Sequence, residues 1–348
     1  MPLPPLIGHE GVKTRLAGAH ASGKLPQALL LAGPRGVGKQ RLALWLAQLI
    51  QCEAPGQEPC GECRSCRMVL SLQHPDVHWF VPLELSKRGG SGGADADKQV
   101  ELVAEALAEE MTARREQPLY APVVGLASHP IAAVRLLLKR LALTPAMGKR
   151  KVFIVGDAER LIPQVGTEVA ANALLKALEE PPADSVIIIT AAEANALLPT
   201  ILSRVVLVRV ARIADTAVTA FAQQTLGISR KDELGQRVNA AEGCIGKLFA
   251  TATPRSGQSG DEQAARFLEA PLRFALGQVP FQARGGFTDM LDALADRLRS
   301  EAKRGGDTAK LVEAIALVMD ARDSAQGNVN PQLLAAVLAE DLQAMRRS

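Results

Sequence analysis

Short apolar runs alternate with longer segments of helical spacing over the first 210 residues of the chain. The runs are continuous in apolar residues, which is typical of strands buried on both faces of a parallel sheet. The helical segments between them supply the crossovers that parallel strands need. The sequence therefore predicts an α/β fold, a parallel sheet with helices on both faces. The expected strands lie within residues 27–33, 74–82, 151–161, 185–192 and 205–210.

The pattern changes beyond residue 210, where helical spacing continues without strand-like runs. A stretch rich in Gly, Ser and Pro at 253–261 is typical of a linker. We therefore expect three domains: an α/β domain over 1–210, a small helical domain over 211–252 and a helical domain over 253–348. Within the first domain, the polar and glycine-rich segment 86–97 predicts a flexible surface loop.

Composition limits the class of protein. A chain of 348 residues, of which 47% are hydrophobic, can bury more than one core. Its net charge of +3 gives no overall electrostatic reason to bind nucleic acid, and an aromatic content of 3% disfavours stacking platforms for single strands. We find neither a secretory signal nor an apolar run of membrane-spanning length, so we expect a cytoplasmic protein with reduced thiols.

Four of the five cysteines lie close together, as Cys52, Cys60, Cys63 and Cys66. Their two-residue spacers let neighbouring thiolates turn back onto one ion, and four sulfurs complete the closed tetrahedral shell of structural zinc. The pattern therefore predicts a structural zinc site. An iron–sulfur cluster and a group of unligated core cysteines are the alternatives. Cys244 lies apart and is expected to be a small buried residue.

The segment GPRGVGKQ resembles a phosphate-binding loop, because it follows an expected strand and begins an expected helix. Gly33, Gly36, Gly38 and Lys39 are the candidate nucleotide-binding residues. Gln40, however, stands where the motif has a serine or threonine whose hydroxyl holds Mg²⁺. Lys39 and the N–H groups at the helix start can cradle phosphates without metal, so nucleotide binding stays open. The alternative is that the glycines serve only the turn.

Four motifs together resemble bacterial clamp-loader subunits, the AAA+ proteins of the DNA polymerase III holoenzyme. They are the glycine-rich loop, the four-cysteine insert after its helix, ANALLKALEEPP at 171–182 and PTILSRV at 199–205. The helical tail is similar to the collar domain of the family. The resemblance implies an AAA+ P-loop-type domain with a zinc module, a small helical lid domain and an all-helical collar domain.

Within this family, the resemblance separates ATP-hydrolysing motor subunits of the gamma/tau type from the delta-prime type. In a motor subunit the loop ends in a hydroxyl residue, and the later strand ends in an Asp-Glu pair. Here Gln40 replaces the hydroxyl, and the pair reads Gly156-Asp157 or Asp157-Ala158, depending on the alignment. Because Mg²⁺ demands near-ideal oxygen geometry, two changes in one metal site imply a delta-prime-like subunit without its own ATPase activity. A motor subunit with unusual loop chemistry is the alternative.

Arg204, in Ser203-Arg204-Val205, stands where the family has a Ser-Arg-Cys triplet that carries an arginine finger. The resemblance implies that Arg204 acts in trans on ATP held by a neighbouring subunit, an effect worth roughly 10³–10⁵ in rate. The alternative is an ordinary interface or surface arginine.

The implied partners are the gamma/tau and delta subunits in a five-subunit ring, which reaches the sliding clamp and primed DNA as a complex. A zinc-stabilised DNA-binding module outside replication is a third interpretation. It would bind DNA alone in a salt-sensitive manner, and the near-neutral charge disfavours it.

Overall fold

A computed structural model gives the fold of the chain. It describes residues 3–4, 6–83, 96–119, 127–161, 169–250, 260–271, 286–303, 307–325 and 330–347. The described residues up to 250 form one compact unit, and those from 260 onwards form a second. The expected loop at 86–97 lies outside the described residues except for its last two positions, which are already helical. The expected linker at 253–261 also lies outside them, apart from Gly260 and Asp261, which begin a helix.

The first unit is built on a five-stranded sheet in the order β2-β3-β4-β1-β5, and every neighbouring pair is parallel. The strands β1, β3 and β4 are buried at every position, whereas the edge strand β5 is largely exposed. This AAA+-like parallel sheet confirms the predicted α/β fold. The strands span Ala28–Ala32 (β1), Val77–Phe80 (β2), Lys151–Val155 (β3), Ser185–Ala191 (β4) and Val206–Arg209 (β5).

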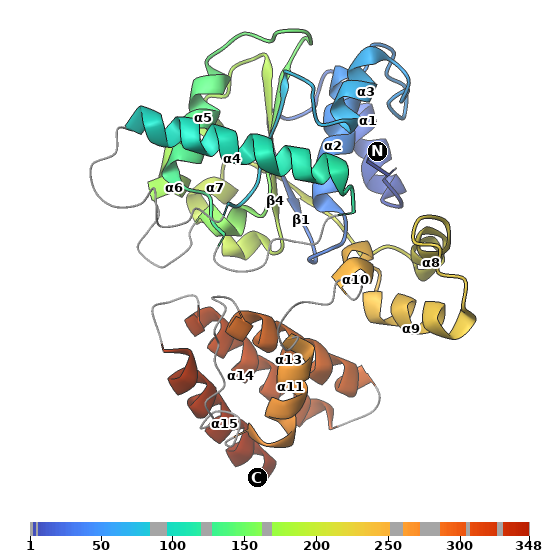
Figure 1. Cartoon of the computed structure of the whole chain (residues 1–348). Coiled ribbons are helices and arrows are strands. Elements are labelled where there is room, and N and C mark those ends of the chain that lie inside the picture. The colour runs from blue at the N-terminus through green and yellow to red at the C-terminus, as the bar shows by residue number, and fades with distance from the viewer. Residues whose placement is uncertain are drawn as a thin grey trace. The chain divides into compact units, whose positions relative to one another are not determined.

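Helices cover the sheet in two groups (Figure 1). The helices α1, α2 and α3 lie to one side and α5, α6 and α7 to the other, while α4 packs along α5. Apolar side chains are buried along nearly the whole of α2, because it lies between the strands and its neighbours α1 and α3. The bounds are Glu10–Ala21 (α1), Lys39–Gln51 (α2), Arg64–Leu70 (α3), Ala96–Glu116 (α4), Ile131–Leu141 (α5), Val169–Glu179 (α6) and Pro199–Leu202 (α7). Short 3₁₀ turns, η2 at Ala158–Leu161 and η3 at Ala194–Ala196, follow β3 and β4.

The remaining helices belong to two further hydrophobic cores. The helices α8 (Asp215–Gln224), α9 (Lys231–Ala241) and α10 (Ile245–Ala250) share a small core within the first unit. The second unit has its own core, formed by α11 (Gly260–Glu269), α13 (Gly286–Lys303), α14 (Thr308–Ala325) and α15 (Pro331–Arg347). The three-domain division expected from the sequence stays a prediction. Among the helices described, no segment combines the length and apolarity that a bilayer crossing requires.

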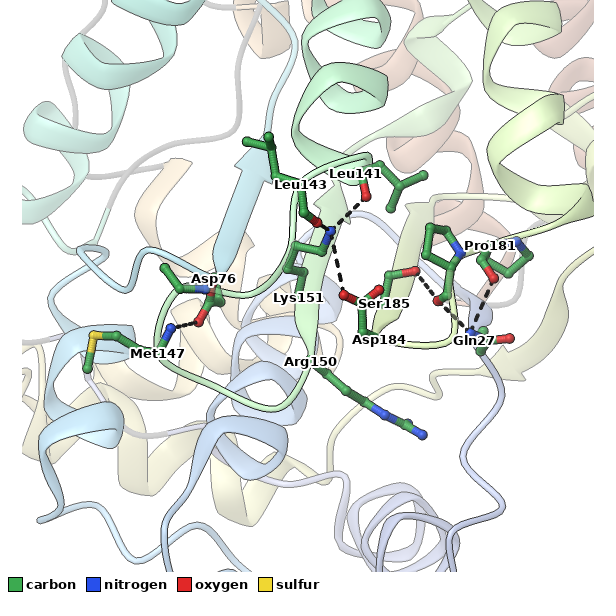
Figure 2. A network of polar contacts seen from close by, with 12 residues as sticks. Gln27, Asp76, Leu141, Leu143, Met147, Arg150, Lys151, Pro181, Asp184 and Ser185 are labelled. Carbon is green, nitrogen blue, oxygen red and sulfur yellow. Dashed lines mark hydrogen bonds and ion pairs between the residues drawn. The ribbon is translucent and has the colours of Figure 1, made fainter.

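Two buried charged residues fix the chain between α5 and β3 (Figure 2). The carboxylate of Asp76 accepts hydrogen bonds from the backbone N–H groups of Ala146, Met147 and Gly148 at 2.6, 2.8 and 2.6 Å. Burial acts to raise the pKa of Asp76, but these three bonds outweigh it, and the pKa lies below its ordinary value. From the other side, Lys151 Nζ donates to the carbonyl oxygens of Leu141 and Leu143. The N-terminal edge of the sheet is therefore held by charge-assisted hydrogen bonds.

Candidate functional site

The loop between β1 and α2 adopts a conformation that requires its glycines. Gly36 and Gly38 have φ angles of 76° and 106°, and α2 begins at the next residue, Lys39. The ammonium of Lys39 turns back into the loop, where Nζ donates to the carbonyl oxygens of Gly33 at 2.7 Å and Pro34 at 2.9 Å. Burial lowers the pKa of Lys39. Two of the three N–H donors of this ammonium are thus engaged by carbonyl groups of the loop itself.

Neighbouring backbone packs directly against two of the loop glycines. A Cβ atom on Gly33 would lie 2.1 Å from the carbonyl oxygen of Val210, at the end of β5. A Cβ atom on Gly36 would lie 3.2 Å from the Cα atom of Gly246, in the first turn of α10. The N–H of Gly246 also donates to the carbonyl oxygen of Gly36 at 2.8 Å. The loop therefore binds the small helical core to the sheet.

Gln40 and Gly156, the two departures from a magnesium site, contact each other. Gly156 follows β3 directly, and a Cβ atom placed on it would lie 3.0 Å from Nε2 and 3.2 Å from Oε1 of Gln40. The Oε1 atom of Gln40 is buried without a hydrogen-bond partner among the residues described. Of the two alignments considered above, this contact favours the one that places Gly156 opposite the loop and Asp157 after it. The amide of Gln40 fills the space that a side chain at 156 would need.

Two carboxylates follow Gly156 near the loop. Asp157 adopts a left-handed conformation with a φ of 49°, and its N–H donates to Oγ1 of Thr190, in β4, at 3.1 Å. The carboxylate of Glu159 accepts from the N–H of Ala192 at 3.3 Å. Burial raises the pKa of Glu159 and the charge of Asp157 raises it further, while the charge of Lys39 acts in the opposite direction. These carboxylates belong to the same electrostatic environment as Lys39.

His129 forms a hydrogen bond with the turn at Gly156, a contact that was not predicted from the sequence. Its Nε2–H donates to the carbonyl oxygen of Gly156 at 2.7 Å. The side chain is buried, and this burial lowers the pKa of His129 to about 4. The ring is therefore neutral and acts as a hydrogen-bond donor. A single histidine outside any motif gives no sequence signal of this role, and Gly246 gives none either.

Arg204 lies between α7 and β5 and interacts with two other segments of the chain. Its Nη2 atom forms an ion pair with Oε1 of Glu179, the last residue of α6, at 2.7 Å. Its Nη1 atom donates to the carbonyl oxygen of Thr200 at 2.8 Å and to Oγ of Ser203 at 3.1 Å. The arginine side chain keeps 31% of its surface exposed, and that of Glu179 keeps 47%. The predicted finger is thus a partly exposed group at the surface of the sheet domain.

The strand register places Arg204 away from the phosphate loop of its own chain. In the parallel pair of β1 and β5, Leu29 is opposite Val206 and Ala32 is opposite Arg209. The loop follows the C-terminal end of β1, whereas Arg204 precedes the N-terminal end of β5. At about 3.3 Å per residue, roughly 10 Å of strand separates the two edges. The structure therefore brings the loop glycines and Lys39 together and leaves Arg204 at the opposite edge.

The four predicted ligands form a compact group between α2 and α3. The sulfur atoms of Cys52, Cys60, Cys63 and Cys66 all lie within 4.8 Å of one another. Backbone N–H groups donate to three of these sulfurs, from Cys60 to Cys52, from Cys63 to Cys60 and from Cys66 to Cys63, at 3.3, 3.4 and 3.3 Å. The bonds from the N–H groups of Cys63 and then Glu62 lower the pKa of Cys60 to about 7.

These N–H bonds favour thiolates, which are the form that ligates metal. Burial, in contrast, raises the pKa of Cys66, and a cation shared by four sulfurs offsets that effect. The cluster can therefore hold a metal ion, and its donor set fits zinc. Cys244 is fully buried in the sheet core, apart from this group.

Comparisons with known proteins agree with this geometry. A family model described as "DNA polymerase III, delta subunit" matches residues 8–214. The DNA polymerase III subunit delta′ of Pseudomonas aeruginosa is 29% identical over 72% of this chain and 62% of its own length. That of Bacillus subtilis is 32% identical over 52% of this chain and 41% of its own. A gamma/tau subunit of Mycobacterium bovis is 31% identical over 57% of this chain and 27% of its own.

The alignments with these delta′ relatives thus span between 41% and 62% of the relatives' length. The family model covers more than half of this chain and includes the loop, the cysteine cluster and both later motifs. The chain therefore belongs to the DNA polymerase III delta′ subunit family of clamp-loader AAA+ proteins.

Proposed function

We propose that this chain is a non-hydrolysing clamp-loader subunit that lends Arg204 to the ATP site of a neighbouring subunit. In the proposed complex, gamma/tau subunits bind and hydrolyse ATP, the delta subunit binds the sliding clamp, and the ring loads the clamp on primed DNA. This chain is a fixed member of the ring beside the motors, and its helical second unit is the collar that holds it there.

The contact between Gln40 and Gly156 carries the non-hydrolysing part of the proposal. A magnesium ion between loop and strand needs an oxygen ligand from each side. Gln40 supplies a buried amide instead of a hydroxyl, and Gly156 supplies no side chain. Because the amide fills the space beside Gly156, both ligands are lost together, and restoring one of them alone would leave the other missing.

The position of Arg204 supports its action in trans. It lies at the edge of the sheet opposite to the chain's own loop. It is partly exposed, and its guanidinium is planar and always charged, which suits bidentate contact with phosphate oxygens. A residue that served its own nucleotide site would instead lie at the C-terminal edge of the sheet, beside Lys39.

We assign structural zinc to the four-cysteine cluster. Bound zinc would cross-link the segment after α2 to the start of α3, and four thiolates leave no coordination position for water or substrate. Its contribution is therefore to the fold of this module, which is also where Cys63 caps the first turn of α3.

Single-turnover phosphate release by the assembled clamp loader tests the proposal. We expect Arg204→Ala to leave the assembly intact, as judged by size-exclusion chromatography, and to remove turnover at the one ATP site that it faces. At that site the loss is worth roughly 10³–10⁵ in rate, while the other sites continue to turn over. Arg209→Ala is the matched control, since Arg209 is an exposed arginine on β5. Equal rates for the wild type and Arg204→Ala would refute the arginine finger.

A motor subunit with unusual loop chemistry is the second candidate, and the similarity to a gamma/tau subunit favours it. It predicts phosphate release by the isolated chain, stimulated by primed DNA. Our proposal predicts that the isolated chain releases no more phosphate than a Lys39→Ala variant purified in the same way. Turnover by the wild-type chain that this variant lacks would establish the motor function.

A further inference from the structure

The motif that carries Arg204 and a second motif without an assigned chemical role meet at one ion pair. ANALLKALEEPP forms α6 and the turn after it, and PTILSRV forms α7 and the approach to β5. Glu179 lies near the end of the first motif and Arg204 near the end of the second, with 2.7 Å between Oε1 and Nη2. Glu179 is the last residue of α6, and the structure places its carboxylate on the proposed finger.

The contacts of Arg204 leave part of its guanidinium available. A guanidinium carries five N–H donors in a fixed planar arrangement. Three of them are engaged, with the carboxylate of Glu179, the carbonyl of Thr200 and the hydroxyl of Ser203. The group is therefore held in one orientation on its own surface, and two of its donors form no bond with the residues that the structure describes.

Glu179 itself is well anchored, because the turn that follows it is bound to the sheet (Figure 2). Nε2 of Gln27, directly before β1, donates to the carbonyl oxygens of Pro181 at 3.4 Å and Pro182 at 2.7 Å. The hydroxyl of Ser185, at the start of β4, donates to the Pro182 carbonyl at 2.7 Å as well. The end of α6 thus has a fixed position relative to the two central strands.

We propose that Glu179 is a positioning residue, which pre-orders the guanidinium of Arg204 for contact with the triphosphate of a neighbouring subunit. This inference rests on the proposed function. A free arginine must lose rotamer freedom when it engages phosphate, and pre-ordering removes part of that loss from the reaction. An exposed ion pair of this kind contributes little to the stability of the fold, so its effect appears in the orientation of the arginine.

The test uses the assembled clamp loader with saturating ATP. We expect Glu179→Gln to lower the single-turnover rate at the affected site by about two- to tenfold, the range that ordering one flexible side chain represents. Glu180→Gln is the matched control, since Glu180 is the next residue of the same motif, is exposed and forms no ion pair with the described residues. Assembly and the ATP concentration for half-maximal rate should stay unchanged in both variants.

Combined variants separate positioning from a general structural effect. In the Arg204→Ala background, Glu179→Gln should cause no further loss of rate, because its only route to the reaction has been removed. A loss that persists in that background would overturn the inference, and so would an unchanged or faster rate for Glu179→Gln alone. If Arg204→Ala itself left the rate unchanged, the proposed function would fail first, and this result is distinguishable from the others.

Discussion

Adding a methyl group at Gly156 should destabilise the chain only while Gln40 is present. In Gly156→Ala the new Cβ atom would lie 3.0, 3.1 and 3.2 Å from three atoms of the Gln40 amide. Normal carbon contacts are about 3.5–4.0 Å, so the amide must move within a buried site. Overpacking of this kind costs about 1–3 kcal/mol. The loss of chain entropy in the unfolded state returns about 0.4–1 kcal/mol, because Gly156 does not require a positive φ angle.

The same substitution in a chain without the Gln40 amide completes a double-mutant cycle. In a Gln40→Ser background the Cβ atom at 156 meets no amide, so Gly156→Ala should be neutral or stabilising by about 0.4–1 kcal/mol. The two substitutions should therefore be coupled by about 1–3 kcal/mol, far above the roughly 0.5 kcal/mol scatter of independent sites. Gly11→Ala is the control, since a Cβ there would meet nothing within 4 Å. It should show the same free-energy change in both backgrounds.

Urea unfolding followed by tryptophan fluorescence measures this cycle. The chain has two tryptophans, Trp45 in α2 and Trp79 in β2, so the signal reports on the first compact unit and not on the C-terminal helices. A coupling below about 0.5 kcal/mol would refute the reasoning. It would mean that Gln40 does not occupy the space beside Gly156, and the argument for a lost magnesium site would then rest on sequence alone.

Three further predictions concern the metal, a buried histidine and a buried carboxylate. Elemental analysis should find one zinc ion per chain. The ion should be absent from Cys66→Ser and present in the control Cys244→Ser. Iron in place of zinc would contradict the assignment. His129 has a folded pKa of about 4 against an ordinary 6.5, so below pH 6.5 the unfolded state takes up a proton that the folded state refuses. The free energy of unfolding should therefore decrease as the pH is lowered, and His129 should account for a loss of about 2 kcal/mol between pH 7 and pH 5. In His129→Gln, the urea midpoint should lose that part of its dependence on pH. Asp76→Asn should cost about 2–4 kcal/mol in the same assay at pH 7, because an amide turns N–H donors towards the N–H groups that the carboxylate accepts. An equal midpoint for Asp76→Asn would show that the bonds at 146–148 contribute nothing net.

The sheet could be predicted from the sequence because its central strands are buried on both faces. β1, β3 and β4 are continuous apolar runs, and each is followed by a loop or turn signal, so local pattern and global fold agree. The cysteine cluster could also be predicted from the sequence, because its four cysteines are close along the chain and their spacing is the one that a tetrahedral metal site requires. The apolar run at 205–210 predicted β5 as well, but it gave no sign that this is an edge strand with Val206 and Leu207 exposed to solvent.

The contacts between distant segments could not be predicted in this way. Gln40 and Gly156 each look like a local loss of a motif residue, and only the packing of α2 beside β3 shows that one fills the space of the other. Glu179 reads as an exposed helix end, since neither helical spacing nor charge indicates which segment its carboxylate will contact. Such contacts depend on the order of the strands in the sheet, and this order cannot be predicted from the local pattern of residues in a single sequence.

The glycine-rich loop has structural uses that need no nucleotide. Gly33 must stay small because the carbonyl of Val210 packs against it, and Gly36 must stay small because Gly246 does. Lys39 donates hydrogen bonds to two loop carbonyls, those of Gly33 and Pro34. The ammonium has three N–H donors, so a phosphate group can bind the third donor or compete for the two that are engaged, each of whose bonds is worth about 1.5–3 kcal/mol. The glycines and the lysine of this loop are therefore accounted for by the packing of Val210 and α10 against it and by the loop's own hydrogen bonds, and their presence alone does not indicate ATP hydrolysis.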